Sequence, residues 1–261
     1  MIFKYKELNI NYEIFDEREE KNNDDKPLLL LHGWMAQIES WAPIYMYFCK
    51  TRPVYVIDFP GQAGKSGELK EPWGVPEYSE MIKSFVEEMS IKGCDVIGHS
   101  FGGRVIIYLS SRYSDMFSKI VLTDAAGIKP KMTIKKFFKI YSYKLAKNFL
   151  KLVLSKEKYE KKIDEMRKKR GSSDYAKLDN DIKRKTFNNI ISLDLTNDLD
   201  NIKNPTLLMW GDKDTDTPLY MAKIMEKKIK DSGLVVLENA GHFSYLDNTQ
   251  KYILVVNEFL K

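Results

Sequence analysis

The residues best placed to do chemistry in this chain are Gly98-His99-Ser100-Phe101-Gly102, which fit the pattern Gly-x-Ser-x-Gly. An apolar, strand-like run at 94–97 precedes the pattern, and a helix-like run at 104–109 follows it. A serine on so tight a strand-to-helix turn is forced into strained backbone geometry, which requires small neighbours. The turn exposes the hydroxyl and places the next backbone N–H at a helix N-terminus, where a developing anion is stabilised. The sequence therefore predicts that Ser100 is a nucleophile.

An activated serine needs a base within hydrogen-bond reach and a third group that orients the base. The chain holds three histidines, His32, His99 and His242. His99 adjoins the serine, so we expect its side chain to point away from the hydroxyl, whereas His32 closes a strand-like run and is expected to shape the following loop. His242 comes just after the last expected strand, at an edge of the sheet where sites form in α/β folds. His242 is therefore the candidate general base.

Four carboxylates compete for the orienting role. Asp212, Asp214 and Asp216 follow one strand-like run late in the chain, and Asp124 follows an earlier one. All four lie between the serine and the histidine in the chain, which is one of the known orders for such a triad. Spacing alone does not choose among them.

Alternating strand-like and helix-like segments must position these groups. Continuous apolar runs bounded by turn residues fit strands that are buried on both faces of a parallel sheet. Such runs occupy 27–31, 54–58, 94–97, 120–123, 206–210 and 234–238. Helical patterns separate them at 40–48, 78–89, 104–114, 219–230 and 249–259, and 3–15 fits a hairpin with an Asn-rich turn. This alternation predicts an α/β fold with a doubly wound, mostly parallel sheet.

The alternation breaks between Gly127 and Asn204, where every pattern is helical. Residues 128–200 hold 20 Lys+Arg and 10 Asp+Glu, so they carry +10, whereas the rest of the +5 chain carries −5. Such a charge step suggests a separate unit, so we expect a helical cap at 128–200 inserted into a core made of 1–127 and 201–261. Its apolar stripe is Ile134, Phe137, Phe138, Tyr141, Leu145, Phe149 and Leu152.

Composition narrows the class of protein further. A chain of 261 residues with 43% hydrophobic side chains can bury one α/β core. Two cysteines build no disulfide framework, the N-terminus has no apolar leader, and no apolar run could span a bilayer, so we expect a cytoplasmic protein without a transmembrane segment. No Cys/His cluster has metal-ligand spacing and no dinucleotide glycine motif is present, so neither metal nor cofactor is expected. No recognisable nucleic-acid module accompanies the basic charge, so no nucleic acid partner is expected.

Five short pieces together make the chain similar to the α/β-hydrolase superfamily over nearly its whole length. They are His32-Gly33, Asp58-Phe59-Pro60-Gly61, the turn at Ser100, Gly211-x-x-Asp214-x-x-x-Pro218 and Gly241-His242. The resemblance implies an α/β-hydrolase fold in which Asp214 is the acid that orients His242, with Asp124 as its main rival. It also implies an oxyanion hole made of the backbone N–H groups of Trp34 and Phe101.

One loop departs from the usual form of the superfamily. Gly61-Gln62-Ala63-Gly64 has two residues between its glycines, where similar proteins have one. The stretch continues into Lys65-Ser66 like a phosphate-binding loop, but Phe59 stands where such a loop needs its first glycine. The shape of this loop is therefore left open.

A serine at the turn favours acyl transfer to water, because similar proteins that open epoxides or displace halides carry an acid there. We expect a hydrolase that cleaves a small or medium carboxylic ester or thioester through an acyl-enzyme on Ser100. A carbon–carbon-bond hydrolase, a proline-type aminopeptidase and a non-catalytic ligand-binding protein stay open as alternatives. The expected partner is a small-molecule acyl ester. The basic cap adds an anionic or carrier-bound acyl group as an option, although a solvated lysine face is the simpler interpretation.

Overall fold

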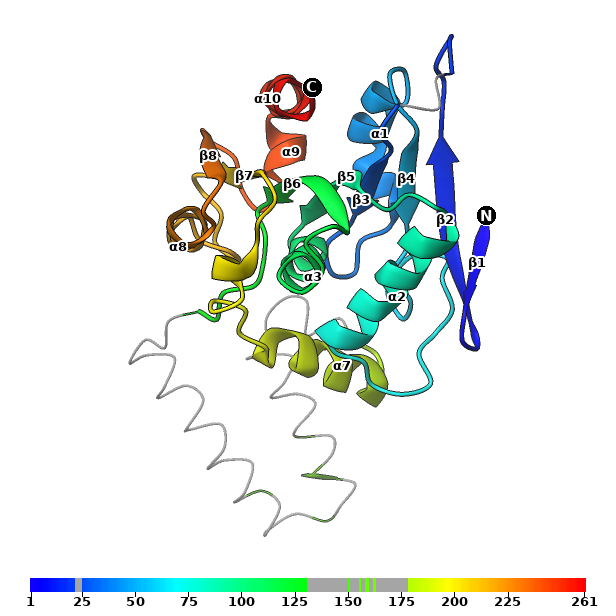
Figure 1. Ribbon diagram of the computed structural model, residues 1–261. Coiled ribbons are helices and arrows are strands. Elements are labelled where there is room, and N and C mark those ends of the chain that lie inside the picture. The colour runs from blue at the N-terminus through cyan, green and yellow to red at the C-terminus, as the bar shows by residue number, and fades with distance from the viewer. Residues whose placement is uncertain (22–24, 131–149, 151–154, 156–157, 160–161, 163–177) are drawn as a thin grey trace.

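In a computed structural model the chain folds around an eight-stranded sheet with the order β1-β2-β4-β3-β5-β6-β7-β8 (Figure 1). The structure describes residues 1–21, 25–130, 150, 155, 158–159, 162 and 178–261. β1 and β2 form an antiparallel hairpin and β2 runs antiparallel to β4, whereas every later neighbour pair is parallel. The predicted α/β fold with a mostly parallel, doubly wound sheet is confirmed.

Strands and helices alternate along the chain as the apolar runs predicted. The strands are β1 (Ile2–Tyr5), β2 (Leu8–Phe15), β3 (Leu28–Leu31), β4 (Val54–Ile57), β5 (Cys94–His99), β6 (Phe117–Thr123), β7 (Thr206–Gly211) and β8 (Ser232–Leu237). The α-helices in the described ranges are α1 (Ala42–Phe48), α2 (Val75–Glu88), α3 (Phe101–Ser110), α7 (Asp181–Ser192), α8 (Tyr220–Lys228), α9 (Ser244–Asp247) and α10 (Thr249–Leu260). Two short 3-10 helices, η1 (Ile38–Trp41) and η2 (Leu199–Asn201), complete the set.

Apolar side chains on both faces of the central strands build two cores. In β3, Leu29 and Leu31 belong to one core while Leu28 and Leu30 belong to the other, as the alternation of side chains along a strand requires. Helices α2, α3 and α8 cover the first face of the sheet, and α1 and α10 cover the second (Figure 1). Because both faces are buried, these strands appear in the sequence as continuous apolar runs.

The strand order reverses at β3, because β4 lies on one side of it and β5 on the other. Loops that leave the carboxyl ends of two such strands diverge, and α/β proteins bind ligands in the resulting crevice. The loop after β3 carries Trp34 and the turn after β5 carries Ser100. The candidate acids and His242 follow β6, β7 and β8, so every predicted site residue lies at this one edge of the sheet.

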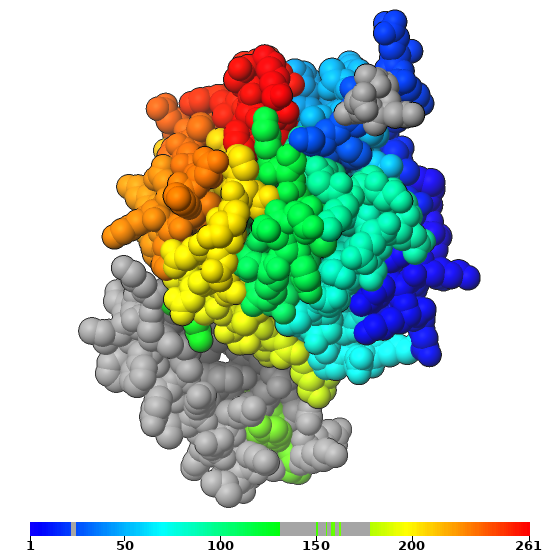
Figure 2. Space-filling view, in the orientation of Figure 1, coloured from blue at the N-terminus to red at the C-terminus, as the bar shows by residue number. Residues whose placement is uncertain are grey.

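Part of the expected cap lies within the described residues, and that part packs on the core. α7 begins after Asn180, whose side chain caps the helix by accepting the Lys183 N–H. The Trp73 N–H donates to the Thr186 hydroxyl, and the Phe187 ring lies 5.4 Å from the Trp34 ring. In the space-filling view, α2 (cyan), α3 (green) and the segment that leads into β7 (yellow) lie side by side above α7 (Figure 2).

The apolar stripe predicted for the cap, from Ile134 to Leu152, lies outside the described residues. The boundaries 128–200 therefore stay a prediction. No helix among the residues that the structure describes is long and apolar enough to cross a membrane.

Candidate active site

Ser100 stands between β5 and α3 in a backbone conformation that few residues adopt, with φ 49° and ψ −106°. Such strain persists only where the surrounding structure enforces it, and it clusters at functional sites. The glycines of the pattern are needed because α3 lies so close to the strands. A Cβ at Gly98 would lie 2.7 Å from the carbonyl carbon of Gly102, and a Cβ at Gly102 would lie 2.1 Å from the Leu31 carbonyl oxygen.

The structure brings Ser100, His242 and Asp214 into one hydrogen-bonded row. Ser100 Oγ lies 3.0 Å from His242 Nε2, and His242 Nδ1 lies 2.9 Å from Asp214 Oδ2. Since a carboxylate oxygen accepts, Nδ1 carries the ring proton and donates it to Asp214. The lone pair of Nε2 then faces the serine hydroxyl, which is the tautomer that a general base needs.

The charges of Asp214 and His242 are coupled across this row. Burial alone would lower the pKa of His242, but the hydrogen bond and the charge of Asp214 outweigh burial and raise that pKa above its ordinary value. Burial alone would raise the pKa of Asp214, but hydrogen bonds from His242 and Thr217 hold it below its ordinary value. Asp214 is therefore a carboxylate at neutral pH, and a protonated His242 is stabilised by its neighbour.

The loop after β7 closes on Asp214 and fixes its orientation. The backbone N–H groups of Asp216 and Thr217 donate to Oδ1 at 2.8 Å and 3.0 Å, and the Thr217 hydroxyl lies 2.6 Å from Oδ2. Asp214 is buried, whereas the side chains of Asp212 and Asp216 are exposed. Of the three acids in this loop, the structure places Asp214 against the histidine.

Asp124, the rival acid, lies close by but bonds elsewhere. Its two carboxylate oxygens accept the backbone N–H groups of Gly211 at 2.9 Å and Ser244 at 3.0 Å. Asp124 therefore contacts the loops that carry Asp214 and His242 without occupying the place of the acid in the row.

Two backbone N–H groups in the described loops near Ser100 lack a protein acceptor. The neighbouring amides are engaged, because Gly102 donates to the His32 carbonyl and Met35 donates to Gln62 Oε1. Within the described ranges, no protein acceptor takes the N–H of Trp34 or Phe101. These are the two amides that the resemblance assigned to an oxyanion hole.

Gln62, one of the two residues between the loop glycines, has a role that sequence reasoning missed. Its side-chain carbonyl accepts the Met35 N–H at 2.8 Å and so supports the loop that presents the Trp34 amide. Met35 has a positive φ of 56°, a conformation that a side-chain acceptor helps to hold. The signal in the sequence was the unusual spacing of the two loop glycines. The partner of Gln62 is a backbone N–H group, and a backbone partner cannot be identified from residue types.

His32 supports the loop that follows β3, as the sequence predicted. Its Nδ1 donates to the Gly33 carbonyl at 2.7 Å, and its Nε2 accepts the Phe59 N–H at 3.1 Å. Burial lowers the pKa of His32, so the ring is neutral and can serve one donor and one acceptor at once.

His99 also contacts His242, but it bonds to the backbone of that residue rather than to its ring. Its Nε2 donates to the His242 carbonyl at 2.6 Å, and burial lowers the pKa of His99 to about 3, so the ring stays neutral. The expectation that His99 points away from the hydroxyl did not foresee this bond, which fixes the loop that carries His242.

Replacing His99 with phenylalanine is expected to lower kcat roughly 10-fold, because one hydrogen bond that positions His242 is lost. Steady-state ester hydrolysis measures the change. Trp41→Phe is the matched control, because Trp41 packs edge-on against the His99 ring with its centroid 6.5 Å away. An equal loss in both variants would attribute the effect to ring packing and contradict the assignment.

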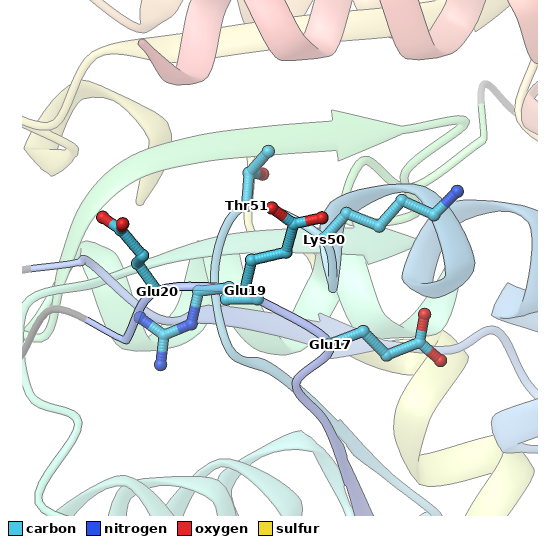
Figure 3. Close-up of a pocket in the computed structure, with 6 residues that line it drawn as sticks. Glu17, Glu19, Glu20, Lys50 and Thr51 are labelled. Atoms are coloured by element: carbon cyan, nitrogen blue, oxygen red, sulfur yellow. The ribbon is translucent and has the colours of Figure 1, made fainter.

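One depression in the structure lies away from this edge of the sheet. It has a volume of about 550 Å³ and is lined by Glu17, Arg18, Glu19, Glu20, Lys50 and Thr51 (Figure 3). Lys50 and Thr51 precede β4, so the depression lies at the amino ends of the parallel strands. It contains none of the residues in the row. In the part of the chain that the structure describes, no group of three His, Cys, Asp or Glu side chains is arranged to hold a metal ion.

Comparison with known proteins agrees with the fold. Residues 26–249 match the family described as alpha/beta hydrolase fold. Pimeloyl-[acyl-carrier protein] methyl ester esterase from Neisseria meningitidis serogroup C is 26% identical over 94% of this chain and 98% of its own. Monoacylglycerol lipase ABHD6 from Rattus norvegicus is 25% identical over 89% of this chain and 74% of its own.

A solved structure of an alpha/beta hydrolase enzyme from a Medee basin deep-sea metagenome library superposes with a TM-score of 0.75 at 22% identity, covering 100% of this chain and 97% of that one. The chain belongs to the alpha/beta hydrolase fold family. It is accordingly an enzyme of the hydrolase class, and the two curated relatives above are named as an esterase and a lipase.

Proposed function

We propose that the chain is a serine esterase that cleaves a small or medium carboxylic ester or thioester through an acyl-enzyme. The observation that carries the proposal is the row in which Ser100 Oγ lies 3.0 Å from His242 Nε2 and His242 Nδ1 lies 2.9 Å from Asp214 Oδ2. A hydroxyl, a base in the right tautomer and an orienting carboxylate are the parts that acyl transfer needs.

In the proposed reaction, Ser100 Oγ attacks the ester carbonyl carbon while His242 Nε2 takes the hydroxyl proton. The negative charge that develops on the carbonyl oxygen is stabilised by the Trp34 and Phe101 amides. His242 then gives its proton to the leaving alkoxide or thiolate, and the acyl group stays on Ser100. Water, deprotonated by the same nitrogen, then attacks the acyl carbon. The bond from that carbon to Ser100 Oγ breaks, the serine oxygen takes the proton back from His242, and the carboxylic acid is released.

The substrate proposal takes one further step from the relatives. A methyl ester on a carrier-bound acyl chain is the narrower candidate, because the Neisseria meningitidis protein named for that reaction aligns over nearly its whole length. The net charge of +10 in residues 128–200 is compatible with an acidic carrier, and we propose that these residues form the cap over the site.

The test of the proposal is labelling of Ser100 by a fluorophosphonate together with hydrolysis of p-nitrophenyl esters of graded chain length. We expect one label, on Ser100, and a chain-length optimum that measures the acyl pocket. Hydrolysis of a carrier-bound methyl ester at a higher kcat/KM than the free ester would favour the narrower candidate. Absence of both labelling and hydrolysis would contradict the esterase proposal and favour a ligand-binding role.

A further inference from the structure

Asp124 is buried at the end of β6 in a conformation that a residue other than glycine rarely adopts, with φ 43°. It lies outside the row of Ser100, His242 and Asp214. Strain and a buried carboxylate at one position call for a compensating role, because each of them alone is unfavourable.

The carboxylate of Asp124 joins two loops that are distant in the sequence. Oδ1 accepts the N–H of Gly211 at 2.9 Å, and Gly211 opens the loop that carries Asp214 three residues later. Oδ2 accepts the N–H of Ser244 at 3.0 Å, and Ser244 follows His242 by two residues at the start of α9. One side chain therefore bonds both to the loop that carries Asp214 and to the loop that carries His242.

The backbone of Asp124 adds a third connection. Its carbonyl oxygen lies 3.0 Å from the Thr217 hydroxyl, and the same hydroxyl lies 2.6 Å from Asp214 Oδ2 and 3.3 Å from His242 Nδ1. Asp124 thus contacts the loop that carries Asp214 at both ends, at Gly211 and at Thr217. It contacts the loop that carries His242 at Ser244, where α9 begins.

We propose that Asp124 is a positioning residue whose ionised carboxylate holds the Asp214 and His242 loops at the separation that the Ser100–His242–Asp214 row requires. This inference rests on the proposed function, because it assigns Asp124 a role in the same site. An ionised carboxylate offers an acceptor oxygen to each of the two amides, whereas a protonated one presents an O–H to one of them.

The surroundings of Asp124 make its ionisation sensitive to pH. The titratable groups that face it are Asp214 from the loop after β7, His242 from the loop after β8, Tyr245 from α9 and Tyr252 from α10. No cation among the described residues forms an ion pair with it. Burial, the largest effect, raises the pKa of Asp124 to about 7, and the charge of Asp214 acts in the same direction. Burial thus brings the titration of Asp124 close to neutral pH, and Asp214 raises the pKa of His242 above its ordinary value.

The experiment measures the rate of fluorophosphonate labelling of Ser100 and kcat/KM for a p-nitrophenyl ester from pH 5 to 9, in the wild type and in Asp124→Asn. For the wild type we expect an acid limb that needs two deprotonations, those of His242 and Asp124. For Asp124→Asn we expect kcat and the labelling rate to fall about 10- to 100-fold at the plateau with KM little changed, because small misplacements of catalytic groups are costly. Its acid limb should need one deprotonation and lie at lower pH, since loss of the nearby negative charge lowers the pKa of His242.

Asp95→Asn is the matched control. Asp95 is equally buried and accepts the Lys119 N–H at 3.0 Å and Arg52 Nη1 at 2.8 Å, but it lies at the amino end of β5, away from the site. We expect its kcat and pH profile to match the wild type when rates are corrected for the folded fraction by circular dichroism.

Equal losses in Asp124→Asn and Asp95→Asn after that correction, or an unchanged profile in Asp124→Asn, would overturn the proposal. If Asp124→Asn does not fold, the pH profile of the wild type tests the proposal alone. An acid limb that needs only one deprotonation would then overturn the proposal. Retention of labelling and hydrolysis in Ser100→Ala would instead contradict the proposed function, so the two failures are distinguishable.

Discussion

Replacing Ser100 with alanine is expected to lower kcat by about a million-fold, the loss seen when the nucleophile of such a triad is removed. The change removes one oxygen atom from a site whose other parts stay in place, because the turn is held by glycine contacts and by the Ser100 N–H bond to the Thr123 carbonyl at 3.1 Å. Steady-state ester hydrolysis with active-site titration measures the loss.

Ser110→Ala is the matched control for this variant. Ser110 ends α3, the helix that follows Ser100, and is buried, whereas Ser100 is partly exposed; the Ser110 hydroxyl has no hydrogen-bond partner among the described residues. Its removal should leave kcat at the wild-type value. If Ser100→Ala kept more than a small fraction of the activity of Ser110→Ala, Ser100 would not be the nucleophile.

Replacing Asp214 with asparagine is expected to lower kcat by about 10,000-fold, because the amide can stabilise the wrong tautomer of the histidine. The asparagine NH₂ would donate toward His242 Nδ1, so the ring proton would move to Nε2. The protonated Nε2 would then face Ser100 and could not accept the proton of the serine hydroxyl. Residual activity should persist to lower pH than in the wild type. The carboxylate raises the pKa of His242, so its loss lowers that pKa and the base stays unprotonated further into acid.

Asp216→Asn tests whether this effect is specific to the acid in the row. Asp216 lies two residues away in the same loop, is exposed and donates its backbone N–H to Asp214, a bond that the substitution keeps. Its kcat should stay close to the wild type. A larger loss in Asp124→Asn than in Asp214→Asn would contradict the assignment and point to Asp124 as the acid.

Much of the fold was predictable because burial on both faces of the sheet leaves continuous apolar runs. The runs at 27–31 and 54–58 differ from β3 and β4 by a single residue at one end each. Boundaries set by local capping were less visible. α2 begins at Val75 rather than at 78, because the Gly74 N–H donates to the Glu77 side chain at 2.7 Å and starts the helix earlier.

The hairpin shows why side-chain type alone misleads. The asparagines that suggested its turn, Asn9 and Asn11, lie inside β2, and the turn is made by Lys6 and Glu7, with Lys6 at φ 52°. Asn11 is used inside the fold instead, where its side-chain amide donates to Asp58 at 2.8 Å. Asn11, a residue type common in turns, therefore serves a tertiary contact here and not a turn.

The part of the candidate site that could be predicted is the part in which side chains bond to one another. Ser100 and His242 were selected by pattern and elimination, while the choice of Asp214 over Asp124 needed the resemblance. The support from His99, Gln62 and Asp124 was not predictable, because each of these side chains bonds to a backbone group whose position depends on the completed fold.

The placement of the row along the chain makes function depend on the order of folding. Ser100 and His242 are 142 positions apart, and β7, β8 and their loops come between them and close the far half of the sheet. Contacts of such long range form late, because the entropy of a large loop must be overcome first. During synthesis from the N-terminus, the turn that carries Ser100 is made well before His242 is added to the chain. A nascent chain or a chain cut before β8 therefore has Ser100 without His242, and under the proposed mechanism reactivity is a property that only the finished molecule acquires.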